Sequence, residues 1–203
     1  MQNIIAENRP ILVNNFIYSI LKGNAGSREE IFEKLQYYEI NINRFSYYSV
    51  YVFAIDDYPE YKRMYSVEQK NMMAIYLKEK LQEGMGKTYS LVAVNNHLDQ
   101  LVVIINFSVD EKDKDIEEKS KEIACRFHRL VTENIPFTVS VGIGKVYNDI
   151  TMVQNSYDEA VECLQYTVVM GHNKVIHYKD LEEFKKMHIK DILLNWKRNC
   201  LTL

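Results

Sequence analysis

Hydrophobic residues recur at two spacings along the chain, and the alternation between them predicts its elements. Apolar positions three or four residues apart predict helices at about residues 12–21, 27–38, 66–81, 113–133, 157–168 and 181–198. Runs of β-branched and aromatic residues predict strands at 49–55, 89–94, 101–107, 137–144 and 174–177. Ser27 with Glu30 and Ser66 with Gln69 have the capping-box form that starts a helix.

After two N-terminal helices, the order is β, α, β, β, α, β and then a further αβ unit. It predicts an α+β fold on the ferredoxin-like plan (βαββαβ plus αβ), with an antiparallel-rich sheet, helices largely on one face and flanking terminal helices. Residues 89–94 and 101–107 flank a polar tip and should pair as an antiparallel hairpin. Gly142 and Gly144 should let a neighbouring element approach closely. The expected division is 1–45 for N-terminal connector helices, 46–180 for the main domain and 181–203 for a C-terminal connector helix.

Composition narrows the class of protein. Of the 203 residues, 47% are hydrophobic and 26% charged, as in a folded globular chain. No apolar run approaches the ~20 residues of a membrane span, and the N-terminus lacks the order of a signal peptide. Cys125, Cys163 and Cys200 are too few and too scattered for a disulfide framework, so we expect buried thiols in a reducing compartment. These features predict a soluble, cytoplasmic protein without membrane contact.

The charge pattern bears on nucleic-acid binding. The formal net charge is -3, and the basic residues are interleaved with acidic ones instead of gathered on one face. Such a chain offers little to a phosphate backbone through counterion release. We therefore expect no direct DNA binding by this chain.

Two stretches resemble a known family. Thr138-Val139-Ser140-Val141-Gly142-Ile143 is similar to the TVSIGIA strand of the GGDEF domain, the diguanylate cyclase palm. Ser156-Tyr157-Asp158-Glu159-Ala160, followed by Gly171-His172-Asn173-Lys174-Val175, resembles the helix and G-x-N-x-V ending of that domain. The variant is similar to the degenerate GGDEF-like domains of AraC-family, two-component-type bacterial transcription regulators. The resemblance covers about residues 46–181 and implies the nucleotide-cyclase palm fold.

The resemblance places the family's signature at the hairpin tip. Residues 101–105 are similar to the EFVVLL run that follows the signature. The positions of Gly-Gly-Asp-Glu-Phe then hold His97, Leu98, Asp99, Gln100 and Leu101. In a cyclase the glycines admit the nucleotide, and the acidic fourth residue helps to hold the divalent metal. Only the aspartate is kept, which implies a degenerate signature loop.

The family's other metal carboxylate belongs at the end of the first strand. This chain offers Ala54-Ile55-Asp56-Asp57 there, a vestigial metal corner in which a two-residue shift decides between an aspartate and Ala54. Phosphoryl transfer depends on positioning and charge neutralisation, so these losses predict a chain that is not an enzyme. We expect no catalytic residue, no bound metal and no cofactor. The Arg-x-x-Asp product-inhibition motif, due near residues 88–91, is absent.

Four other groups are open to a chemical interpretation. Cys125 and His128 share a helix face, but no second ligand pair accompanies them, which favours a core thiol and a surface histidine. Gly142-x-Gly144 lacks the third glycine of a dinucleotide fingerprint. His172 and His177 have no nearby nucleophile and are expected at the surface. A tyrosine group could stack a ligand, although core and interface packing is favoured; its members are Tyr37, Tyr38, Tyr47, Tyr48 and Tyr51.

The functional hypothesis is a non-catalytic signalling and dimerisation module of a transcription regulator. The module would relay a signal from an upstream sensor or receiver to a downstream helix-turn-helix domain that is not present in this chain. We expect a homodimer through the terminal helices, with DNA reached only through that missing domain. One alternative is a residual GTP-binding or diguanylate cyclase-like enzyme with Asp56, Asp57 and Asp99 as metal ligands. Another is a small-effector sensor with a pocket near the tyrosines.

Overall fold

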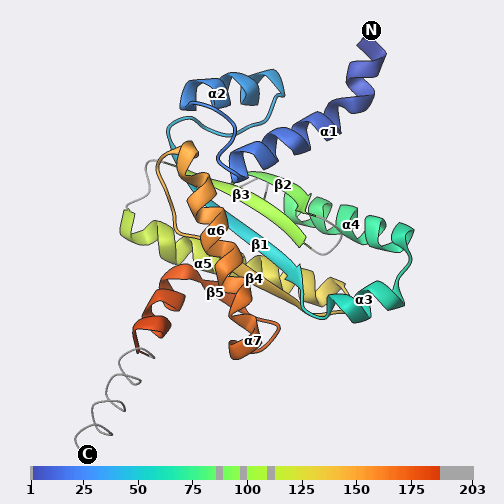
Figure 1. Cartoon of the computed structure of the whole chain (residues 1–203), viewed down its shortest axis with the longest axis vertical. Coiled ribbons are helices and arrows are strands. Elements are labelled where there is room, and N and C mark those ends of the chain that lie inside the picture. The colour runs from blue at the N-terminus through green and yellow to red at the C-terminus, as the bar shows by residue number, and fades with distance from the viewer. Residues whose placement is uncertain (1, 86–88, 97–99, 109–112, 188–203) are drawn as a thin grey trace, which may run out of the picture.

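The computed structural model describes residues 2–85, 89–96, 100–108 and 113–187, and this described part is built around a five-stranded sheet (Figure 1). Its strands are β1 (Ser46–Ile55), β2 (Ser90–Asn96), β3 (Gln100–Ser108), β4 (Val139–Ile143) and β5 (Val175–His177). Across the sheet they follow the order β2-β3-β1-β4-β5. All neighbours are antiparallel except β4 and β5, which are parallel.

The connections have the ferredoxin-like plan that the sequence predicts. β3 lies between β1 and β2 and is antiparallel to both, so β1 and β2 form a split βαβ unit. Helices α3 (Tyr58–Met64) and α4 (Val67–Met85) lead from β1 to β2, and α5 (Asp113–Asn134) leads from β3 to β4. The appended unit consists of η1 (Ile150–Met152), α6 (Val153–Gln165), α7 (Thr167–Met170) and β5. The predicted α+β class is confirmed, and the predicted elements occur in the expected order, with α3 as an additional helix between β1 and α4.

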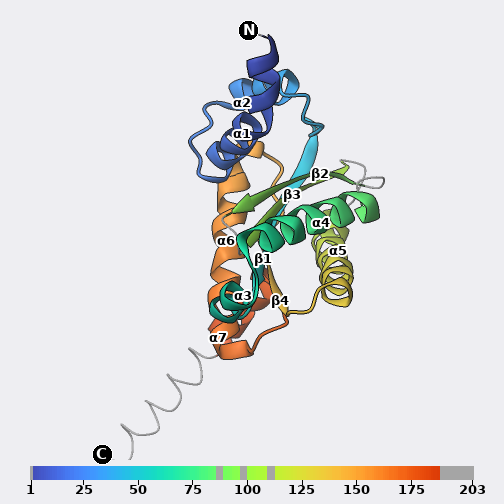
Figure 2. The same cartoon turned by 90° about the vertical axis from the view of Figure 1, so that its right-hand side faces the viewer.

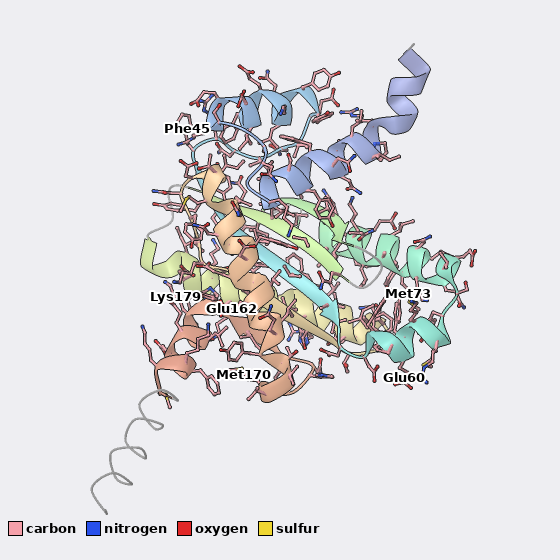
Figure 3. All side chains as sticks on the ribbon, viewed as in Figure 1. Phe45, Glu60, Met73, Glu162, Met170 and Lys179 are labelled. Carbon is pink, nitrogen blue, oxygen red and sulfur yellow. The ribbon has the colours of Figure 1, made fainter. Side chains whose placement is uncertain are left out.

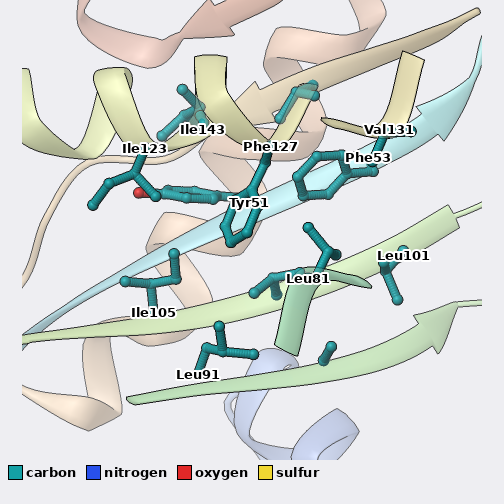
Figure 4. Packing of buried hydrophobic residues seen from close by; sticks show 14 of the residues in the cluster. Tyr51, Phe53, Leu81, Leu91, Leu101, Ile105, Ile123, Phe127, Val131 and Ile143 are labelled. Atoms are coloured by element: carbon teal, nitrogen blue, oxygen red, sulfur yellow. The ribbon is translucent and has the colours of Figure 1, made fainter. Parts of the chain in front are cut away.

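Helices cover both faces of the sheet, whereas the sequence led us to expect them largely on one. On one face, Tyr51 and Phe53 pack against α4 and α5 (Figure 4). On the other face, Val50 and Val52 pack against α6 and the N-terminal helices (Figure 2). The reason is the continuous apolar run of β1: both alternate sets of its side chains are apolar, so each face needs a cover.

The two N-terminal helices, α1 (Gln2–Leu21) and α2 (Arg28–Tyr37), are part of the second hydrophobic core. Ile17 and Leu21 are completely buried there. The capping box that starts α2 is present, because Ser27 Oγ accepts the Glu30 N–H at 3.3 Å and Glu30 Oε2 accepts the Ser27 N–H at 2.7 Å. The reciprocal bonds of Ser66 and Gln69 form at the start of α4 as predicted.

The predicted close approach at the two glycines is confirmed, and the approaching element is α6. A Cβ atom on Gly142 would lie 2.0 Å from the Ala160 carbonyl oxygen. One on Gly144 would lie 1.9 Å from the Ser156 carbonyl oxygen. Only glycine therefore lets the α6 backbone rest directly on β4 and the residue after it.

A helix follows β5 directly and covers residues 178–187, so it begins three residues before the predicted position. Lys121 Nζ lies 2.6 Å from Asp180, and Lys145 Nζ lies 2.9 Å from Glu182. Lys185 pairs with Glu162 of α6, and Figure 3 labels Glu162 on that helix. Residues 188–203, which include most of the predicted connector helix, lie outside the described residues. Within the described part, no helix is both long and apolar enough to cross a membrane.

Candidate functional site

The hairpin of β2 and β3 brings the described end of the signature segment beside the end of β1. Gln100 pairs with Ala54, and Leu101 pairs with Phe53. His97, Leu98 and Asp99 lie outside the described residues. Asp56 follows Ala54 by two positions, so the sheet corner contains Gln100 and Ala54 side by side with a carboxylate just beyond them.

The Asp56 carboxylate joins three segments of the chain. It accepts a hydrogen bond from the Ser140 hydroxyl of β4 and one from the Asn173 N–H at 2.9 Å. The Asp56 N–H donates to the Thr138 carbonyl oxygen at 3.1 Å. Asn173 has a φ of 57°, in the left-handed region, so its bond to Asp56 holds a turn that most residues avoid. Both carboxylate oxygens thus have structural partners.

Asp57 serves a different element. It is the N-cap of α3, and its Oδ1 accepts the Glu60 N–H at 3.1 Å. The two neighbouring aspartates therefore turn to different partners, one towards β4 and one towards α3. Across the described ranges, no three or more His, Cys, Asp and Glu side chains form a group that could hold a metal ion.

A small cavity lies between this end of the sheet and helices α3 and α4. Its volume is about 30 Å³, and apolar side chains such as Phe53, Met73 and Leu101 line it. A space of that size accommodates about two water molecules. The buried Lys70 at its edge donates from Nζ to the Lys62 carbonyl oxygen at 3.0 Å, near the C-terminal end of α3, where a cation is favourable.

A second polar group lies at β5 and contains His177, which is buried at 3% exposure and not at the surface as predicted. Its Nδ1 accepts the Lys179 N–H at 3.1 Å, so the ring proton sits on Nε2, which lies 2.9 Å from Glu117 Oε2. That contact is poorly aligned for a hydrogen bond. Burial opposes ionisation of Glu117, but the close approach of His177 and Lys179 Nζ, the latter at 3.1 Å, outweighs burial and lowers the pKa of Glu117.

The inner face of α6 carries polar side chains that hold the loop after β4. Ser156 Oγ accepts the Val50 N–H at 2.9 Å and donates to the Lys145 carbonyl oxygen at 2.8 Å. Glu159 accepts the Lys145 N–H at 2.7 Å and the Tyr147 hydroxyl at 2.8 Å. Burial raises the pKa of Glu159, and burial together with the Glu159 bond raises the pKa of Tyr147. Ser156 and Glu159 have the i, i+3 spacing that places two side chains on one face of a helix, and this spacing was the sequence signal for the polar group.

The cysteine and histidine of α5 take roles opposite to those expected. Cys125 is exposed, whereas Cys163 is buried as predicted. His128 turns inward, and its Nε2 lies 2.8 Å from the Val139 carbonyl oxygen. His172 is exposed, as predicted. The buried face of α5 contains Ala124 and Phe127. Cys125, one residue after Ala124, is rotated out of that face, so its predicted burial is wrong.

The predicted tyrosine group does not gather into one cluster. Tyr48 and Tyr51 are both fully buried but belong to opposite cores, because successive strand residues point to opposite faces. Tyr37 is 72% exposed and makes an edge contact with Tyr38. No shared pocket among the described residues unites the five rings.

The fold and the corner define an α+β palm of the nucleotide-cyclase class. A family model described as "GGDEF-like domain" matches residues 22–166, and the chain therefore belongs to that family. The match includes α2, the sheet up to β4, and α6. The comparison with curated protein sequences returns no match.

Solved structures of GGDEF domains share the fold. The FimX GGDEF domain from Pseudomonas aeruginosa is 12% identical, with a TM-score of 0.50 over 73% of this chain and 91% of that one. The active GGEEF domain of a diguanylate cyclase from Vibrio cholerae is 13% identical, with a TM-score of 0.44 over 72% and 88%. Diguanylate cyclase SiaD from P. aeruginosa, solved in complex with its activator SiaC, is 10% identical, with a TM-score of 0.49 over 86% and 70%.

Proposed function

We propose that this GGDEF-like domain is a non-catalytic signalling module of a transcription regulator. It receives a signal from a sensor or receiver domain and passes it to a helix-turn-helix domain that contacts DNA. The observation that supports this best is the engagement of both corner carboxylates in the fold, Asp56 with Ser140 and Asn173 and Asp57 with the N-terminus of α3.

The chemistry of phosphoryl transfer explains why that engagement matters. A magnesium-bound triphosphate needs anionic oxygen ligands placed to neutralise its charge. At the corner, Gln100 offers an amide beside the methyl group of Ala54. The neighbouring cavity, lined mainly by apolar side chains, has a volume of only about 30 Å³, room for about two water molecules and not for a nucleotide. These features support a palm that no longer turns over GTP.

Turnover and binding assays with GTP and magnesium test the loss of catalysis. We expect no cyclic product and no magnesium-dependent rise in melting temperature, since a ligand stabilises a protein only if it binds the folded state. The matched comparison is a variant with the family signature restored, His97→Gly, Leu98→Gly and Gln100→Glu. Stabilisation of the unaltered protein by GTP together with magnesium, but by neither alone, would support the residual-enzyme alternative.

The terminal helices are the proposed route of the signal and the proposed homodimer contact. α1 buries Ile17 and Leu21, yet leaves Ile11 60% and Leu12 42% exposed. Neighbouring exposed apolar residues on a helix are typical of a contact surface. At the other end, the helix of residues 178–187 is fastened to α5 and α6 by ion pairs and so leaves the domain in a defined direction.

Sedimentation velocity tests this contact without removing α1, whose other face belongs to the core. We expect Ile11→Glu with Leu12→Glu to convert a dimer to a monomer while the circular dichroism spectrum stays unchanged. Val168→Glu, at a residue that is 86% exposed on α7, is the control and should leave the dimer intact. Equal sedimentation of both variants and the unaltered protein contradicts the proposed contact.

A further inference from the structure

A hollow beside the signature corner, with Asp57 in common, lies between α3 and the segment that enters β4. Its volume is about 290 Å³. Three rings form its aromatic wall: the Tyr61 centroid lies 4.7 Å from that of Phe137 and 5.1 Å from that of Tyr65. Tyr61 is buried, whereas Tyr65 and Phe137 are half-buried, so solvent reaches the hollow past the latter two rings.

The phase of α3 makes the rim of this hollow acidic. Asp57, Glu60, Tyr61 and Met64 follow the i, i+3, i+4, i+7 spacing of one helix side, and all four line the hollow. Figure 3 labels Glu60 on this helix. The two basic residues of α3, Lys62 and Arg63, are not among the lining residues, since they lie at other angles around the helix. The helix therefore turns its acids towards the rings and its bases away.

Neither rim carboxylate is neutralised within the described part of the chain. Asp57 uses one oxygen to cap α3, and Glu60 forms no ion pair with a described residue. An aromatic wall below an anionic rim attracts a positive charge through both the ring quadrupoles and the carboxylates. The structure contains an internal example, because Lys70 Nζ lies 5.9 Å from the Tyr61 centroid.

We propose that this hollow is a binding site for a small organic cation of the quaternary or methylated ammonium class. A bare metal ion needs several oxygen ligands in place of its water, whereas rings and aliphatic side chains make up most of this lining and Asp57 already uses one oxygen to cap α3. Methyl groups on the nitrogen spread the charge over an apolar surface, which the rings and the exposed Met64 side chain can contact. The site does not depend on the proposed relay.

Choline and its uncharged isostere 3,3-dimethyl-1-butanol are the probes for this site. The two have almost the same shape and differ by the positive charge. In NMR titrations of the full chain, we expect choline to shift the signals of the Met64 methyl group and the Thr138 amide. The isostere should bind roughly fivefold more weakly or worse, in keeping with the size of cation–π and ion-pair contributions.

Two variants locate the charge and the ring that act. Glu60→Gln removes the rim charge at nearly constant volume, and Phe137→Leu keeps an apolar wall without a quadrupole. Each should weaken choline binding roughly fivefold, whereas Glu79→Gln, an equal charge change on α4 outside the hollow, should leave it unchanged. Unchanged heteronuclear spectra outside the hollow show that the variants are folded.

Three results overturn the proposal. Equal binding of choline and the isostere would define an apolar hollow without charge selectivity. Choline binding that survives both Glu60→Gln and Phe137→Leu would place the cation elsewhere. Tighter binding of N-acetylarginine amide than of choline would mark the hollow as an anchor for a partner protein's arginine instead of a small-molecule site.

Discussion

Two regions of the molecule differ in how they are held together: the contact between β4 and α6, here called the seam, and the corner between the signature hairpin and the end of β1. At the seam, Gly142 and Gly144 let the backbones touch, and Ser156 and Glu159 hold the adjoining loop. At the corner, Gln100 stands beside Ala54, and Asp56 bonds to Ser140 and Asn173. The residues that carry the family resemblance are those that assemble the palm. The comparison teaches that two different kinds of contact hold this GGDEF-like domain together, backbone against backbone at the seam and side-chain hydrogen bonds at the corner.

The largest expected effect is at the seam. Gly144→Ala would push a methyl group to within 1.9 Å of the Ser156 carbonyl oxygen, so the α6 backbone has to move. We expect a loss of roughly 3 kcal/mol in the free energy of unfolding, measured by urea titration. Gly171→Ala meets no atom within 4 Å but has a φ of 90°, and strain alone should cost about 1 kcal/mol. If Gly144→Ala costs no more than Gly171→Ala, the seam is not a tight contact.

Ser156→Ala should have the next largest effect. Its hydroxyl is the buried partner of both the Val50 N–H and the Lys145 carbonyl oxygen. Removal leaves a central strand amide without a partner, for an expected loss of about 2 kcal/mol by the same urea titration. Asn155→Ala, at the exposed neighbouring position, should change stability by less than about 0.5 kcal/mol.

Asp56→Asn carries the comparison to the corner. The amide can accept through only one atom, so its NH2 group either faces the Asn173 N–H, a donor against a donor, or faces Ser140 and requires that hydroxyl to turn from donor to acceptor. We expect a loss of about 1–2 kcal/mol in thermal unfolding. Asp57→Asn should be nearly neutral, because asparagine caps a helix as well as aspartate does. A gain in stability from Asp56→Asn would show that Asp56 is held for a ligand and not for the fold.

The smallest expected effect is a pH dependence at the β5 group. The pKa of Glu117 is lowered in the folded state from its usual 4.5, so its contribution to stability is present above that value and is lost as the pH falls through the folded pKa. Stability profiles of the unaltered protein and Glu117→Gln should therefore converge on acidification below about pH 4.5.

Local patterns in the sequence predicted most of the fold. The hairpin, both capping boxes and the close approach at Gly142 and Gly144 each depend on residues near one another in the chain. α3 was not among the helices predicted from the sequence, because Pro59 after the first strand indicates only that strand pairing ends. Proline is equally compatible with the first turn of a helix, and Asp57 was the capping signal.

Contacts between distant segments were beyond reach from the sequence. The burial of His177 depends on Glu117 of α5, and the role of Asp56 depends on Asn173 in the turn before β5. Neither pair has a sequence spacing that a periodic pattern can detect. The helices that pack on the second face of the sheet, α6 with α1 and α2, could not be predicted either. The apolar run of β1 indicates that both faces are buried, but not which helices bury them.

The contact between the α6 and β4 backbones also has a mechanical consequence. Where side chains lie between two elements, a change of rotamer can accommodate a small relative movement of those elements. Where two backbones are in direct contact, no side chain lies between them to adjust. α6 and β4 should therefore be displaced together as one stiff body. α1 packs on α6, and β5 pairs with β4. A displacement of α1 should therefore also displace β5, which the helix of residues 178–187 follows directly.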